Sequence, residues 1–139
     1  MDWKECKDKN FVKEVKINEN LINSLINSSK NKLESNQRLE LDETTASTKL
    51  SIVYESLREL LEARAIKIGF KIYNHDCFCA FLSEMWEDKI SSLNFYKFRK
   101  IRNQINYYGK DVPKEEAKTI IKEIISLRNS ILNKYFKTY

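Results

Sequence analysis

Residues 44–70, TTASTKLSIVYESLRELLEARAIKIGF, carry the most regular amphipathic pattern in the chain. Apolar side chains recur there every three or four residues, which is the spacing of one face of an α-helix. They are Leu50, Val53, Tyr54, Leu57, Leu61 and Ile68. Gly69 follows at the place where helices commonly end on a left-handed residue. We therefore expect one long helix with an apolar face that other helices must cover.

Four further segments show helical spacing or helix-start residues, so we expect five helices in all. Asn18 suits the start of the first, and Pro113 followed by acidic residues suits the start of the last. The segments are residues 18–39, 74–85, 91–109 and 113–135. Residues 1–17 form a lead-in segment, which packs on its own subunit or reaches across to another. Residues 18–139 form one helical domain.

The composition favours an all-α fold. Only two glycines and one proline occur in 139 residues, whereas sheet proteins use many such residues in turns. Five helices with one apolar face each bury those faces as an antiparallel bundle of four to five helices. No stretch is apolar over the length of a membrane span, and the first ten residues are too polar for a secretion signal.

The three cysteines give no sign of a metal or redox site. Cys77 and Cys79 are two apart in a helical segment, so they point about 200° away from each other. We interpret them as small buried hydrophobic residues. Reduced thiols are typical of the cell interior, which predicts a cytoplasmic protein. The net charge of +5 permits an anionic partner without requiring one.

A cationic stretch, KFRKIRNQINYYGKDVPKEEA at residues 97–117, holds the candidate site. On a helical wheel Phe98, Ile101, Ile105 and Tyr108 fall in one narrow sector, which we expect to face the core. Arg102 and Asn106 lie side by side on the flank of that sector, and Phe95 and Arg99 continue the same flank. Tyr107 lies about 140° from Arg102 on a regular helix.

Two interpretations of this stretch remain open. In the first, it is a solvated basic helix face on which Arg102 pairs with a carboxylate. In the second, it is a surface for single-stranded nucleic acid, since bases stack on aromatic rings and phosphates pair with cations. Phe95 and Tyr96 would then be the rings available for stacking. The candidate RNA-binding residues are Lys97, Arg99, Lys100 and Asn106.

Two segments of the chain are similar in sequence to a known family. Residues 54–84, YESLRELLEARAIKIGFKIYNHDCFCAFLSE, followed by residues 101–117, IRNQINYYGKDVPKEEA, resemble the HEPN domain family of small prokaryotic helical proteins. The similarity spans roughly residues 20 to 137. It consists of a long helix rich in Leu, Glu and Arg, then a turn that ends in His75, then an Arg-Asn motif before the last helix.

The resemblance implies a bundle of four or five helices that forms a homodimer. For active members it also implies metal-independent RNA cleavage by an Arg-x(4–6)-His motif at the dimer cleft. Many members are toxins encoded beside a nucleotidyltransferase that acts as antitoxin, and others only bind nucleotides or act as interaction modules. It implies neither a metal nor a cofactor.

Carried over by position, the motif gives three candidate catalytic residues. Arg102 matches the arginine, Asn103 the polar residue after it, and Tyr107 stands where many active members have histidine. A phenol with a reference pKa of about 10 is protonated at pH 7 and is a poor base. His75, the only histidine, is interpreted as a structural residue at a helix start, with catalysis as the alternative.

The 140° separation of Arg102 and Tyr107 leaves two ways to bring them together. Gly109 lets the helix unwind after Asn106, or a two-fold axis places Arg102 of one subunit near Tyr107 of the other. The sequence thus predicts an RNA-associated homodimer with a degenerate ribonuclease motif. The alternative is a non-enzymatic interaction or nucleotide-binding module that partners a nucleotidyltransferase.

Overall fold

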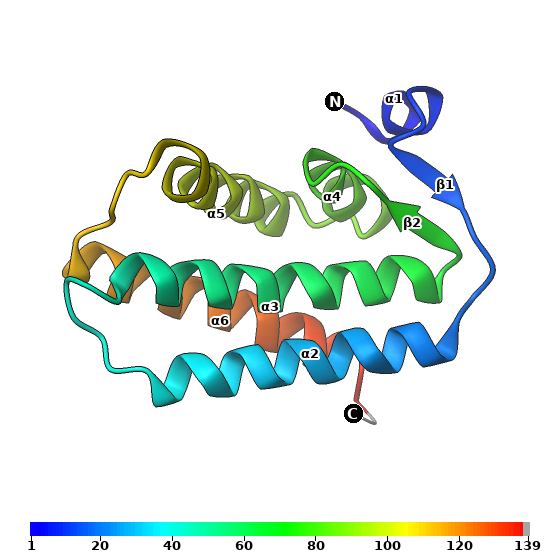
Figure 1. The fold of residues 1–139 in the computed structure, drawn as a ribbon. Coiled ribbons are helices and arrows are strands. Elements are labelled where there is room, and N and C mark those ends of the chain that lie inside the picture. Colours follow the sequence, from blue (N-terminus) through cyan, green and yellow to red (C-terminus); the bar gives the residue numbers. More distant parts are fainter. Residues whose placement is uncertain (138–139) are drawn as a thin grey trace.

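The computed structural model describes residues 1–137, and most of them are helical (Figure 1). In chain order the elements are α1 (Trp3–Asp8), β1 (Val12–Glu14), α2 (Glu19–Arg38), α3 (Ala46–Lys67), β2 (Phe70–Ile72), α4 (Asp76–Ala80), the π-helical turn η1 (Phe81–Met85), α5 (Lys89–Tyr108) and α6 (Lys114–Tyr135). The prediction of a mostly helical fold is confirmed. No helix within residues 1–137 combines the length and the apolar character needed to cross a lipid bilayer.

Helix α3 lies at the centre of the molecule. In Figure 1, α2 runs along one side of it, α5 along the other, and α6 behind it. Because these helices cover α3 on several sides, it buries residues around most of its circumference and not only along the predicted apolar face. Its leucines Leu50, Leu57, Leu60 and Leu61 are fully buried. Each such side chain contributes about 1.5–3 kcal/mol through the area it removes from water.

A buried polar cluster lies where α2, α3 and α6 meet. Ser29 of α2 donates a hydrogen bond to the carbonyl oxygen of Ser56 in α3 (2.6 Å), and Ser56 donates one to the carbonyl oxygen of Ser29 (2.7 Å). Arg128 of α6 donates from Nε to the Ser56 hydroxyl (2.7 Å). Burial lowers the pKa of this guanidinium. The small serines let three helices approach closely, and their hydroxyls satisfy the buried cation.

Residues 1–17 fold back onto their own chain. β1 pairs with β2 in an antiparallel two-stranded sheet, in which Val12 lies opposite Ile72 and both side chains are buried. Cys6 of α1 forms a disulfide with Cys77 of α4. The lead-in segment is therefore attached to α4 and β2, at the upper right of Figure 1.

The prediction of reduced thiols is wrong for Cys6 and Cys77. These residues are 71 positions apart in the sequence, and the pairing of β1 with β2 brings their helices together. Cys79 is free and half-buried, and burial raises the pKa of its thiol to about 11. Disulfides persist mainly in oxidising compartments, so the step from reduced thiols to a cytoplasmic location loses its basis.

The ends of the helices follow the expected local signals in most places. The side chain of Asn18 caps α2 by accepting from the Leu21 backbone N–H (3.0 Å). Gly69, just after α3, has a φ of +94°, a value that L side chains adopt only with strain. α5 starts at Lys89, earlier than the predicted Ser91, because Asp88 caps it by accepting from the Ser91 backbone N–H (2.9 Å).

Candidate functional site

A cavity of about 670 Å³ lies between α5, the turn from β2 to α4, and the residue that precedes β1. Pockets of a few hundred cubic ångströms are of the size that binds small molecules or single nucleotides. The lining side chains are Phe11, Tyr73, Asn74, His75, Arg99, Arg102, Asn103 and Tyr107. We call this the α5 cavity. It gathers three candidate residues of the Arg-Asn motif together with the only histidine.

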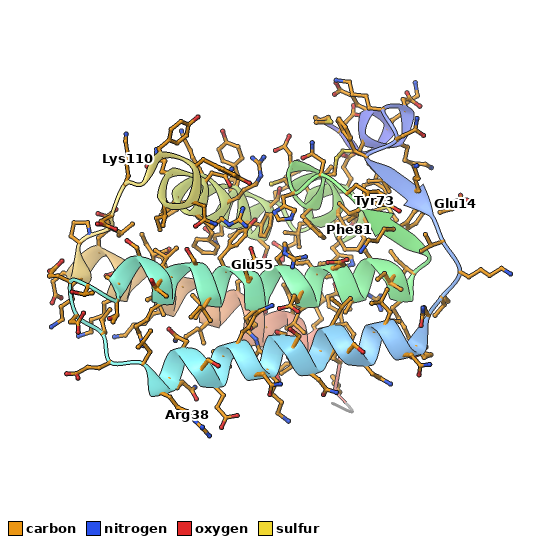
Figure 2. The ribbon with its side chains drawn as sticks, in the orientation of Figure 1. Glu14, Arg38, Glu55, Tyr73, Phe81 and Lys110 are labelled. Carbon is orange, nitrogen blue, oxygen red and sulfur yellow. A yellow bond between two sulfur atoms is a disulfide. The ribbon has the colours of Figure 1, made fainter. Side chains whose placement is uncertain are left out.

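Arg102 is held in place by a carboxylate and two aromatic rings. Its Nη2 donates to Oε1 of Glu55 on α3 (2.9 Å), and Figure 2 shows Glu55 on the side of α3 that faces α4 and α5. The guanidinium carbon lies 5.3 Å from the ring centre of Tyr54 and 6.0 Å from that of Tyr107. Such cation–π contacts fix a guanidinium without neutralising it. Its Nε makes no hydrogen bond with any residue in 1–137.

Glu55 pairs with a second arginine in addition to Arg102. Its Oε2 accepts from Nε of Arg58 (2.8 Å), and Arg58 donates further to Glu62 (2.5 Å). Lys71 of β2 contacts Glu62 as well. Three cations, Arg58, Arg102 and Lys71, thus share two carboxylates, so the network keeps one net positive charge beside the cavity.

His75 lines the cavity next to these groups and is neutral at pH 7. Burial, together with the nearby cation Arg58, lowers its pKa to about 4. Its Nδ1 lies 3.2 Å from the hydroxyl of Tyr54. The expected helix-start role belongs instead to Asn74, whose side chain accepts from the Asp76 backbone N–H (2.9 Å). His75 itself makes no side-chain cap.

Tyr107 contacts Arg102 within one chain. α5 stays helical through Tyr108, and Gly109 forms its left-handed cap with a φ of +63°. The helix therefore does not unwind after Asn106. Both side chains are long enough to bridge their angular separation, so neither unwinding nor a symmetry axis is needed for the contact at 6.0 Å.

The predicted RNA-binding residues fall in different places. Arg99 lines the α5 cavity and lies 3.9 Å from Asp76. Lys100 lies in an adjoining groove of about 310 Å³, which also contains Tyr96. Asn106 faces Ser51 of α3, and Lys97 pairs with Glu123 of α6 (2.7 Å). The structure thus brings Arg99 and Lys100 near the motif and separates Lys97 and Asn106 from the cavity.

Two predictions about aromatic residues on α5 are wrong. Phe95, expected on the flank and free to stack on a base, is fully buried and stacks on Tyr54 at 5.6 Å. Tyr108, expected in the core, is 75% exposed. Both errors have one cause: the buried sector of α5 is rotated toward Phe95 and Arg102, because α5 packs that side against α3.

Several residues of the cavity carry no signal in the linear motif. Phe11, Tyr73 and Asn74 reach it through the pairing of β1 with β2, in which the Tyr73 backbone N–H donates to the Phe11 carbonyl oxygen (2.7 Å). Glu55 does not line the cavity, but it holds Arg102 there from α3. Within residues 1–137 no three His, Cys, Asp or Glu side chains gather in a way that suits a metal ion.

No family model, curated protein or solved structure matches this chain. The chemistry of the site is therefore read from its geometry. Two guanidiniums, a neutral imidazole, two amides and three aromatic rings surround a cavity open to solvent. This combination suits a ligand that has both an anionic group and a planar ring.

Proposed function

We propose that this protein is a HEPN-like helical bundle that binds single-stranded RNA in the α5 cavity as a homodimer and carries a degenerate ribonuclease motif. The observation that carries the proposal is the convergence of Arg99, Arg102, Asn103 and Tyr107 with His75 on one cavity. RNA offers the two features that these residues suit, because its phosphates are anionic and its unpaired bases are planar.

The surface around the cavity supports binding of a strand longer than one nucleotide. Tyr73 is 58% exposed and Tyr107 is 70% exposed, so each offers a ring face at the cavity. The adjoining groove adds Tyr96, Lys100 and Tyr108. Alternating rings and cations along one surface are what single strands bind without strong sequence preference.

An exposed apolar strip on α5 supports the homodimer. Ile90 is 75% exposed and Leu93 is 70% exposed, one turn apart on the outer side of the helix. Tyr96 continues the strip toward the grooves. A homodimer joined at this strip would cover the apolar surface on both copies.

Cleavage is not part of the proposal, because the cavity lacks a base matched to neutral pH. Tyr107 is a phenol, and the imidazole of His75 has a pKa of about 4, which makes it a weak proton acceptor at pH 7. Arg102 remains able to stabilise negative charge on a phosphate. We therefore propose RNA binding with little or no hydrolysis, in a toxin-like protein.

A second candidate function is that of an interaction module. The same strip of Ile90 and Leu93 favours it, since exposed apolar residues that lie together often mark a protein contact. The partner would be a nucleotidyltransferase, as the family resemblance implies. In that case the Arg-Asn motif only holds α5 against α3.

The salt dependence of RNA affinity tests the proposal. We expect binding of a single-stranded oligonucleotide to weaken steeply with salt, because bound phosphates release counterions. Arg99→Gln and Arg102→Gln should each weaken binding and reduce the slope of log affinity against log salt by about 0.7, the value for one lost phosphate contact on a single strand. Lys100→Gln should have a smaller effect.

Lys30→Gln is the matched control. Lys30 is exposed on α2, which lies on the other side of α3 from α5 (Figure 1). The Lys30→Gln substitution removes one positive charge, as the α5 substitutions do, and it should leave the RNA affinity and the salt slope nearly unchanged. Absence of RNA binding at low salt, or equal losses in the α5 and α2 variants, would contradict the proposal and leave the interaction module.

A further inference from the structure

The contact between His75 and Tyr54 has a consequence for the chemistry of the cavity. Tyr54 is fully buried in α3, and its hydroxyl lies 3.2 Å from Nδ1 of His75. Within residues 1–137 this is the hydroxyl's only hydrogen bond partner, and Nε2 of His75 has none. One ring nitrogen is therefore tied to the core, and the other remains for a ligand.

The buried hydroxyl selects one tautomer of the neutral imidazole. If Nδ1 carried the proton, it would donate to the tyrosine oxygen, and the phenolic proton would be left buried without an acceptor. An unsatisfied buried donor costs about as much as a lost hydrogen bond. When Tyr54 donates to an unprotonated Nδ1, both groups are satisfied. The proton of His75 then resides on Nε2.

The charges around the ring keep it neutral. α3 contributes Glu55 and Arg58, and α5 contributes Arg99 and Arg102. Asp76 lies next to His75 on α4 and pairs loosely with Arg99. Three guanidiniums against two carboxylates disfavour a proton on the imidazole, in the same direction as burial. The phenol cannot take over as an anion, because burial raises the pKa of Tyr54 well above its ordinary value.

We propose that His75 is a binding residue of the α5 cavity that donates a hydrogen bond from Nε2 to a phosphate oxygen of RNA, and that Tyr54 is the positioning residue that fixes this tautomer. The inference rests on the proposed function and adds the recognition of the backbone phosphate. Arg99 and Arg102 line the same cavity and supply the charge. His75 adds a directed donor without charge, so it contributes affinity without changing the salt slope.

Nitrogen NMR of the imidazole is the first measurement. The chain has a single histidine, so its two ring nitrogens give unambiguous signals. We expect Nδ1 to be unprotonated and Nε2 protonated in the free protein at pH 7. Tyr54→Phe should convert this single tautomer into a mixture while the fold persists, because only the hydroxyl is removed. Tyr73→Phe, which removes a hydroxyl at the rim of the same cavity, should leave the tautomer unchanged.

RNA titration is the second measurement. On adding an oligouridine of about eight nucleotides, we expect the Nε2–H signal to shift as it bonds to phosphate. His75→Phe should weaken binding at least about tenfold, the lower end of the range for one hydrogen bond to a charged group, with an unchanged salt slope. His75→Gln keeps a donor and should recover part of the affinity.

The outcomes separate the inference from the proposed function. An Nδ1-protonated ring in the free protein overturns the role of Tyr54. Normal RNA binding with an unmoved Nε2–H signal and a full-affinity His75→Phe variant overturns the role of His75 and leaves the RNA-binding function standing. No RNA binding by the wild-type protein overturns both.

Discussion

At the scale of single residues, Arg102 combines two roles that a sequence motif cannot separate. It anchors α5 to α3 through Glu55, and it also lines the α5 cavity. Glu55 also pairs with Arg58, and the network of Arg58, Arg102 and Lys71 with Glu55 and Glu62 keeps one net positive charge. Of the first interpretation of the basic stretch, the pairing of Arg102 with a carboxylate is thus observed, but the Arg102 side chain is only 16% exposed and does not lie on a solvated face.

His75 should make the stability of the protein depend on pH. Burial lowers its pKa from the ordinary 6.5 to about 4, so between these values the unfolded chain binds a proton that the folded chain does not. This contribution to the free energy of unfolding is fully present above pH 6.5 and is lost as the pH falls toward 4. We expect a loss of roughly 2 kcal/mol, since solvent screens part of the effect at a half-buried ring.

Urea unfolding of wild type and His75→Gln between pH 4 and pH 7 measures this contribution. Carboxylates such as Asp42 and Asp88, whose pKa values hydrogen bonds lower, titrate in both proteins and cancel in the difference. The glutamine variant should lack the His75 component. Parallel pH profiles for the two proteins would show that the imidazole keeps an ordinary pKa.

At the scale of elements, the N-terminal segment acts as one wall of the cavity. α1 is tied to α4 by the Cys6–Cys77 disulfide, β1 is paired with β2, and Phe11 between them lines the cavity. The wall therefore depends on contacts between parts of the chain that are distant in sequence.

Removing the disulfide should destabilise the protein strongly. The bridge closes a loop of 71 residues, for which the chain-entropy estimate is about 4 kcal/mol. We expect Cys6→Ala combined with Cys77→Ala to lose that much free energy of unfolding in urea titrations. Cys79→Ala, which removes the free half-buried thiol, is the control and should cost far less. Three titratable thiols in the unfolded, unreduced protein would contradict the bridge.

The helices could be predicted from the sequence because their signals lie within each element. The spacing of Leu50, Val53 and Leu57 and the caps at Asn18 and Pro113 are local, and all of them stand. The rotation of α5 could not be predicted, because it depends on packing against α3. Phe95 lies on the flank beside one edge of the predicted wheel sector and Tyr108 lies at the opposite edge, so a modest rotation of the helix buries Phe95 and exposes Tyr108.

The cavity was predictable only in part, for a similar reason. Arg99, Arg102, Asn103 and Tyr107 lie on one helix, so the motif located them together. The distance from His75 to that helix is set by how α4 and α5 pack on α3. No sequence pattern indicates this distance, and none indicates that Cys77 pairs with Cys6.

At the scale of the whole molecule, the residues that line the α5 cavity lie on one side of the bundle. Glu55 lies on the side of α3 that faces α4 and α5 (Figure 2), and the cavity residues come from α5, the turn before α4 and the N-terminal segment. The side formed by α2 and α6 contributes the serine and arginine packing instead. A ligand of the α5 cavity should therefore contact the protein only on the side of the bundle where the cavity lies.

Photocrosslinking tests the central claim most directly, because it reports where RNA lies. Irradiation of the protein bound to a 4-thiouridine oligonucleotide, followed by peptide mass spectrometry, should place crosslinks at Tyr73 and Tyr107, the exposed rings of the cavity. Arg102→Gln should reduce both. Crosslinks confined to the α2 and α6 side, or unchanged yields in the Arg102 variant, would contradict the account.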